Sequence, residues 1–140
     1  MIYEMKLNEL YFEKISSGKK TMVHGLFDNW RRLLNIGDRI IFENIGNAEQ
    51  RIAVVVKSLH RYASFEDMLI AIPVEKWGNA STDFPREAAI KMNQYYTIDQ
   101  IQKYGVIAID ISLIDLAPVV KDLQIQKETE FERLFPDGMK

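Results

Sequence analysis

The chain has 140 residues, 47% of them hydrophobic and 27% charged, which gives room for one globular domain with a real core. Its longest apolar runs have five residues, far short of the roughly 20 that a membrane-spanning helix needs. There is no cysteine for a disulfide or a thiol site, and two histidines are too few for a structural zinc site. Residues 1–4 lack the start of a signal peptide, so we expect a reducing, cytoplasmic compartment.

The net charge of -2 hides an uneven distribution of charged residues. Between Lys14 and Arg61, nine cations stand against four acids, a local net charge of +5, and the rest of the chain carries -7. A basic segment of this kind either contacts a polyanion or only solvates strand edges and loops.

The first half of the chain reads mainly as strands. Residues 1–7 alternate with the period of a half-buried strand, and a helix that Asn8 caps and Gly18 ends follows. Residues 28–35 read as a loop or a short helix. The run from Ile52 to Val56 is apolar on both faces, so its strand should have two neighbours in the sheet. The strands expected in one sheet are 1–7, 21–27, 39–44, 51–60 and 106–116.

Two capping sequences predict helices in the second half. One helix begins after Ser64, and a second begins after Thr97 and stops at Gly105. Between them, residues 78–85 are expected to be irregular and residues 86–96 to be helical.

We expect residues 1–116 to form one domain and residues 117–140 to be an extension of unknown role. In this extension we predict a strand near 119–125 and a helix near 129–135, with so few large apolar groups that a cut after Leu116 would cost little stability. The chain has more strands than its helices separate into parallel units. This order predicts an α+β fold, a mixed and partly closed β-barrel with flanking helices.

Several common site motifs are missing from the sequence. Neither of the glycine-rich phosphate loops, G-x-x-x-x-G-K and G-x-G-x-x-G, occurs in it. No nucleophile-elbow sequence surrounds a serine that could act with His24 or His60. Nucleoside-triphosphate, dinucleotide and serine-hydrolase chemistry are therefore not indicated, and we expect no cofactor and no metal.

Five stretches, in this order and spacing, resemble the ASCH domain, the activating-signal-cointegrator homology family of the PUA-like superfamily. They are Ser17 to Thr21, Ile36 to Asn44, Leu59 to Phe65, Tyr95 with Tyr96, and Tyr104 to Ile109. The resemblance covers residues 1–116. It implies a PUA-like β-barrel with flanking helices, and a cleft that binds RNA or a nucleotide-like ligand, lined by the Lys20 strand and the His60–Arg61 segment.

Some small ASCH proteins are amidohydrolases that deacylate acylated cytidine with a lysine, a threonine and a glutamate. Lys20 matches the lysine, but the position of the nucleophilic threonine is occupied by Val23, which has no hydroxyl. Thr21 is the nearest hydroxyl and Glu75 the nearest carboxylate, so Lys20, Thr21 and Glu75 are the weak catalytic candidates. We expect no activity on acylated cytidine.

The basic candidates can be interpreted without the family. Lys20 begins a strand after a helix end, where its ammonium binds a phosphate, acts as a desolvated base, or is a solvated turn residue. His60 and Arg61 precede a helix N-terminus, which favours an anion site. The alternative is that Arg61 pairs with Glu66 or Asp67 on the surface.

The remaining candidates are polar or aromatic. Tyr95 and Tyr96 either stack on a base or belong to the core. His24, beside Gly25, and Asn44, at a strand end, either contact a ligand or serve the local fold. The expected ligand-binding residues are Lys20, Thr21, His24, Asn44, His60, Arg61, Tyr95 and Tyr96.

The leading hypothesis is an RNA-binding module whose basic cleft contacts phosphates and stacks a base, with Trp30, Arg31 and Arg32 either extending this surface or capping the barrel. A small hydrolase acting on a modified nucleoside, and a protein-interaction module, are the alternatives. A closed pocket that holds Lys20, Thr21 and Glu75 together would favour the hydrolase, and an open basic groove would favour RNA.

Overall fold

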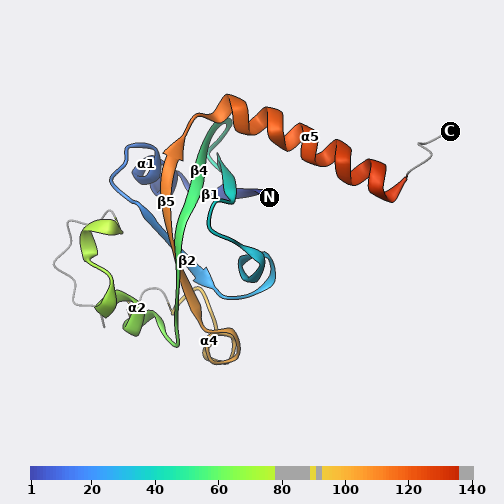
Figure 1. Ribbon diagram of the computed structural model, residues 1–140. Helices are drawn as coiled ribbons and strands as arrows, with labels where there is room; N and C mark the ends of the chain where they lie inside the picture. Colours follow the sequence, from blue (N-terminus) through green and yellow to red (C-terminus); the bar gives the residue numbers. More distant parts are fainter. Residues whose placement is uncertain (78–88, 91–92, 136–140) are drawn as a thin grey trace.

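The computed structural model describes residues 1–77, 89–90 and 93–135 of the chain (Figure 1). The expected strands form one five-stranded sheet in the order β1-β3-β4-β5-β2, which curls into a half-barrel. β1 runs parallel to β3, and the other pairs are antiparallel, so the predicted mixed α+β fold is confirmed. The strands are β1 (Ile2–Leu7), β2 (Met22–Leu26), β3 (Arg39–Asn44), β4 (Asn47–Tyr62) and β5 (Val106–Ile114).

β4 is the central strand, and its two predicted neighbours are β3 and β5. It spans 16 residues, longer at both ends than the predicted range 51–60. Its pairing with β3 ends at Val55, its pairing with β5 continues to Tyr62, and the register with β5 shifts between Val56 and Ser58. Such a bulge bends a strand, which lets one long strand follow the curl of the sheet.

Helix α1 (Glu9–Ser16) and helix α2 (Phe65–Ala71) begin at their predicted caps. The Asn8 side chain accepts a hydrogen bond from the Tyr11 N–H at 2.8 Å, and Ser64 caps α2 in the same way. These bonds satisfy N–H groups that a helix start otherwise leaves unpaired. Two short 3-10 helices are also present, η1 (Asn29–Leu33) and η2 (Val74–Lys76).

Helix α4 (Ile98–Tyr104) has the predicted capping box, in which Thr97 and Gln100 each bond the other's backbone. It ends at Gly105, whose φ of 71° only glycine adopts readily. The irregular segment predicted over residues 78–85 lies outside the described residues. Of the helix predicted over 86–96, residues 89–90 are helical, but residues 93–96 form a turn and a bend, so the helix prediction is wrong for these last residues.

Alternate residues of the sheet are buried on opposite faces. On β5, Ile107 and Ile109 belong to a cluster on the inner face, together with residues of α1. Val106 and Ala108 belong to a cluster on the outer face, together with residues of α2 and α4. Helices therefore cover both faces of the sheet, and the inner face with α1 is where the candidate site forms.

Helix α5 (Leu116–Leu134) is continuous, so the strand predicted over residues 119–125 is wrong. Val119 and Leu123 are four residues apart and are both buried on the outer face of the sheet, as the period of a helix requires. Pro118 lies in the first turn, where a missing N–H costs nothing. No helix in the described part of the chain combines the length and apolarity needed to cross a membrane.

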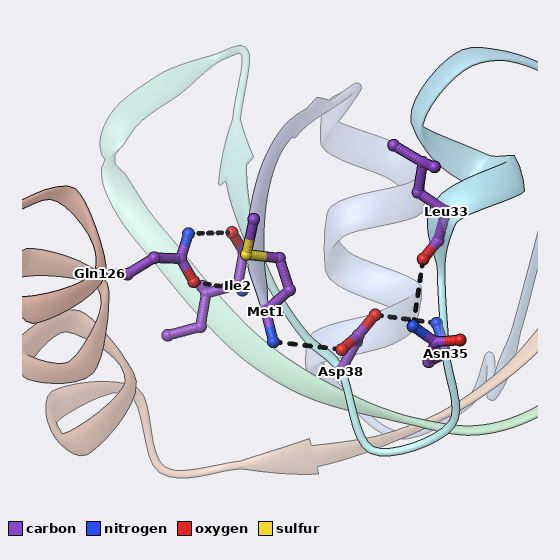
Figure 2. A network of polar contacts seen from close by, with 6 residues as sticks. All are labelled: Met1, Ile2, Leu33, Asn35, Asp38 and Gln126. Carbon is purple, nitrogen blue, oxygen red and sulfur yellow. Dashed lines mark hydrogen bonds and ion pairs between the residues drawn. The ribbon is translucent and has the colours of Figure 1, made fainter. Parts of the chain in front are cut away.

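Figure 2 shows how polar contacts fix β1 at its first residues. The Gln126 side chain of α5 accepts from the Ile2 N–H at 2.7 Å and donates to the Ile2 carbonyl at 3.0 Å. Asp38 accepts from the Asn35 N–H at 2.8 Å and lies 3.2 Å from the amino group of Met1. The edge strand β1 is thus tied both to α5 and to the turn before β3.

Candidate functional site

The half-barrel leaves a seam between its two edge strands, β1 and β2, and a pocket of about 330 Å³ lies at this seam. Its floor is apolar and comes from the inner face, with Met5 of β1, Phe42 of β3 and Ile109 of β5. α1, η1 and residues 95–96 complete its walls. The volume suits one small ligand or one nucleotide.

Lys20 supplies a buried ammonium to this pocket and is only 5% exposed. Its backbone pairs with Trp77, and its Nζ lies 3.5 Å from the Trp77 carbonyl oxygen. The same Nζ lies 5.3 Å from the centre of the Tyr11 ring and 5.1 Å from that of Trp77. None of the carboxylates that the structure describes pairs with it. Burial, and secondly Lys14, lower the pKa of Lys20 to about 8.

Arg31 is the second cation of the pocket. Its Nη1 lies 3.2 Å from Asp28 Oδ1, and its Cζ lies 5.3 Å from the centre of the Trp30 ring. A Cβ on Gly25 would come within 2.5 Å of Arg31 Nε. The glycine in β2 therefore provides the space in which this guanidinium lies.

His24 lines the pocket between aromatic rings, with its own ring edge-on to Phe65 and Trp77 at 5.7 and 5.6 Å between centres. Its Nδ1 is buried and has no hydrogen-bond partner. Burial, and then the charges of Lys20 and Arg31, lower the pKa of His24 to about 3. The imidazole is therefore uncharged at neutral pH and cannot serve as a cationic contact.

The tyrosine pair has two different environments. Tyr96 is half-buried and stacks on Phe65 with 5.6 Å between ring centres, whereas Tyr95 is 77% exposed. Burial, followed by the neighbouring Tyr95 and Tyr96, raises the pKa of Tyr11. Tyr96 thus combines core packing with a place on the pocket wall, and Tyr95 lines the pocket where it meets solvent.

The structure brings together Lys20, His24, Tyr95 and Tyr96 among the predicted residues, and places the others elsewhere. Thr21 lines a separate hollow beside β5, and its N–H donates to the Lys76 carbonyl.

Asn44 is the last residue of β3, just before the turn to β4, and is 1% exposed. Its side chain donates to Gln50 and accepts from the Gly46 N–H, so it shapes this turn. Glu75 is exposed on η2 and does not line the pocket.

His60 and Arg61 lie near the end of β4, outside the pocket. His60 Nε2 is 3.0 Å from Ser58 Oγ, and Arg61 Cζ lies 3.8 Å from the centre of the Phe27 ring. The alternative ion pair of Arg61 with Glu66 or Asp67 does not form; the guanidinium stacks on a ring instead.

Sequence reasoning missed Tyr11 and Trp77, the two rings that flank Lys20. Tyr11 repeats at helical spacing with core residues of α1, so its pattern indicated only packing. Trp77 reaches Lys20 through a bridge between segments 57 residues apart, and no local pattern signals that contact.

No protein-family model and no curated protein matches the chain. Among solved structures, the hypothetical protein PH0355 has a TM-score of 0.71 and 37% identity, over 81% of this chain and 100% of its own. PF0455 from Pyrococcus furiosus has a TM-score of 0.64 and 29% identity, over 83% of this chain and 100% of its own.

ASCH from Zymomonas mobilis has a TM-score of 0.53 and 15% identity, over 80% of this chain and 66% of its own. This likeness in structure confirms the fold that the resemblance to the ASCH domain implied. The chain therefore belongs to the same family as the hypothetical protein PH0355, and its fold is the ASCH-domain fold.

Proposed function

We propose that the protein binds single-stranded RNA by taking one nucleotide into the pocket between β1 and β2. One observation carries this proposal: Lys20 is a buried ammonium without a carboxylate partner among the described residues, in a pocket whose floor is apolar. A nucleotide combines a flat, largely apolar base with an anionic phosphate, and these are the two properties that such a pocket complements.

The base has aromatic partners from three segments of the pocket lining. Tyr11 of α1, Trp30 of η1 and Tyr96 all line it. Stacking on such rings is the usual way in which proteins hold unpaired bases, and it contributes about 1–3 kcal/mol per base.

The phosphate has Lys20 as its principal partner. Arg31 already shares its charge with Asp28, and none of the described lining residues is an aspartate or a glutamate. An anion beside Lys20 would offset the desolvation that lowers its pKa, so the charged form and the bound phosphate stabilise each other.

The geometry supports the hydrolase alternative less well. No serine, threonine or carboxylate is among the described lining residues, and Val23 lines the pocket where the amidohydrolases have a threonine. Thr21 and Glu75 are both elsewhere. Lys20 is the one candidate residue that the pocket shares with those enzymes, and we therefore propose binding and not acyl transfer.

The test is fluorescence anisotropy with a labelled single-stranded oligonucleotide at low salt, together with calorimetric titration of nucleoside monophosphates. Lys20→Met keeps an unbranched side chain only one atom shorter and removes its charge, and it should weaken both affinities about tenfold or more. Lys19→Met, an exposed neighbour, is the matched control and should leave them unchanged. Equal affinities of wild type and Lys20→Met, or no binding by folded wild type, would overturn the proposal.

A further inference from the structure

Exposed cations and aromatic rings gather at the end of the sheet where β2 ends and β5 begins. The Phe27 N–H donates to the Gly105 carbonyl at 3.0 Å, which joins these two chain ends. Arg61 Cζ lies 3.8 Å and Arg32 Cζ 5.8 Å from the centre of the Phe27 ring. Lys103 Nζ lies 5.1 Å from the ring centre of its neighbour Tyr104. Arg61, Lys103 and Tyr104 also line one shallow hollow.

The cations of this group have no acidic partner in the described part of the chain. Lys6 and Arg39 elsewhere on the sheet, by contrast, pair with Glu43 and Asp122. At 3.8 Å from the ring centre, the Arg61 guanidinium lies against the face of Phe27 and keeps its N–H donors available to an anion.

This surface continues from the pocket. Gly25, Ile107 and Arg61 lie opposite one another on β2, β5 and β4, and therefore share the inner face. With neighbouring strands about 4.8 Å apart, the Arg61 backbone is roughly 10 Å from Gly25. The pocket residue Arg31 lies over Gly25, and the next residue of η1, Arg32, lies on Phe27.

We infer that the RNA strand leaving the pocket runs over this basic strip, made of Phe27, Arg32, Arg61, Lys103 and Tyr104. The inference rests on the proposed function and adds a second contact to it. The cations of the strip contact successive phosphates, and its rings offer stacking faces, a combination typical of surfaces that bind single strands without reading sequence.

The experiment measures affinity against the length of uridine oligonucleotides, from the mononucleotide through the dinucleotide and tetranucleotide to the hexanucleotide. Wild-type affinity should rise with length. Arg61→Gln should lose about tenfold on the hexanucleotide, with the slope of log affinity against log salt smaller by about 0.7, and should bind the mononucleotide as wild type does. Arg51→Gln is the matched control, an exposed arginine of the same strand outside the strip, and should behave as wild type.

Different results separate the two proposals. The strip is wrong if the mononucleotide binds but affinity does not rise with oligonucleotide length. It is also wrong if Arg61→Gln and Arg51→Gln weaken hexanucleotide binding equally. Neither result contradicts nucleotide binding in the pocket. The strip is also wrong if Arg61→Gln weakens binding of an acidic peptide and not of RNA. If neither the mononucleotide nor the hexanucleotide binds the folded protein, the proposed function itself is wrong, and the strip inference that rests on it is wrong too. Arg32→Gln repeats the test on η1 and should give the same loss as Arg61→Gln.

Discussion

The ammonium of Lys20 is buried, which disfavours its charged form. The contribution of Lys20 to the free energy of unfolding therefore depends on pH. The pKa of Lys20 falls from 10.5 to about 8 on folding, so between these values the unfolded chain binds more protons than the folded one. Stability therefore rises with pH across this window, and below pH 8 the ammonium is destabilising by up to about 3 kcal/mol. Lys20→Met should accordingly raise the urea midpoint at neutral pH and lack the gain between pH 8 and 10.5.

The control for this prediction is Lys19→Met, which should keep the pH-dependent gain of the wild type, because Lys19 is exposed. A Lys20→Met variant that is less stable than wild type at neutral pH would show that the packing of the lysine stem outweighs the cost of its charge.

Adding one methyl group at Gly25 should lower nucleotide affinity and leave the stability of the fold almost unchanged. In Gly25→Ala the new Cβ would meet Arg31 Nε at 2.5 Å, so the guanidinium must move away from the pocket wall. The end of an arginine side chain moves easily, and we expect the free energy of unfolding to change by less than about 1 kcal/mol while nucleotide affinity falls several-fold. Thermal unfolding and calorimetric titration measure the two quantities.

A double-mutant cycle checks the cause of that loss. If Gly25→Ala acts by displacing Arg31, it should have no further effect on affinity in an Arg31→Gln background. Additive losses would show that the alanine disturbs the pocket by another route.

The residues of the site could be predicted only in part, because the sequence gives strand periods and not the curl of the sheet. Lys20 and His24 were found because His24 belongs to β2 and Lys20 lies two residues before this strand, in a segment that a local pattern marks. Asn44 and Arg61 also lie near strand ends, but the Asn44 side chain bonds Gln50 and Gly46, and Arg61 lies against the Phe27 ring outside the pocket. Trp77 contacts Lys20 through a β-bridge between distant segments, which no local sequence pattern predicts.

Among the elements, those with side-chain caps could be predicted well, since Asn8, Ser64 and Thr97 each satisfy N–H groups of the helix that follows. α5 lacks such a signal. Its N-cap residue Asp115 makes no side-chain bond, and a proline with two valines at its start favours other structures by propensity. Burial against the sheet decides in favour of the helix, which is information that only the tertiary structure holds.

The burial of α5 reverses the expectation that a cut after Leu116 costs little. Such a cut removes Val119, 1% exposed, and Leu123, 6% exposed, together with the Gln126 bonds to β1. It should lower the free energy of unfolding by several kcal/mol, and Leu123→Ala alone by about 2–4 kcal/mol. Urea unfolding followed by circular dichroism measures both.

The outer half of α5 supplies the comparison, because it extends past the edge of the sheet (Figure 1). A chain ending at Glu128 keeps the contacts with the sheet, and the described residues that it lacks are all exposed. Its unfolding should match that of the full chain within about 0.5 kcal/mol. If both shortened chains unfold like the full chain, α5 contributes nothing to the core, and the domain ends near residue 116 as the sequence suggested.

Over the whole molecule, the basic segment from Lys14 to Arg61 does not form one positive surface. Lys20 and Arg31 line the pocket, Arg32 and Arg61 belong to the strip outside it, and Arg39 pairs with α5 through Asp122 at 2.6 Å. Folding thus separates these cations of the basic segment into an ion pair with α5 and two adjoining sites. A steep salt dependence is expected only for ligands long enough to reach both sites.

The seam also predicts how a ligand changes the stability of the entire fold. β1 and β2 are the two ends of the sheet and are not paired with each other, whereas the pocket takes residues from both. A nucleotide in the pocket contacts both edges, so it should protect amide hydrogens of β1 and β2 together from exchange. At a free concentration of about 100 times its Kd, the ligand adds about 2.7 kcal/mol, a rise in Tm of roughly 5–10 °C. Lys19→Met should show the full rise. Lys20→Met should show about half of it or less, because a tenfold weaker affinity leaves about 1.4 kcal/mol at the same ligand concentration. Protection confined to η1 and β4 would place the ligand on the strip alone.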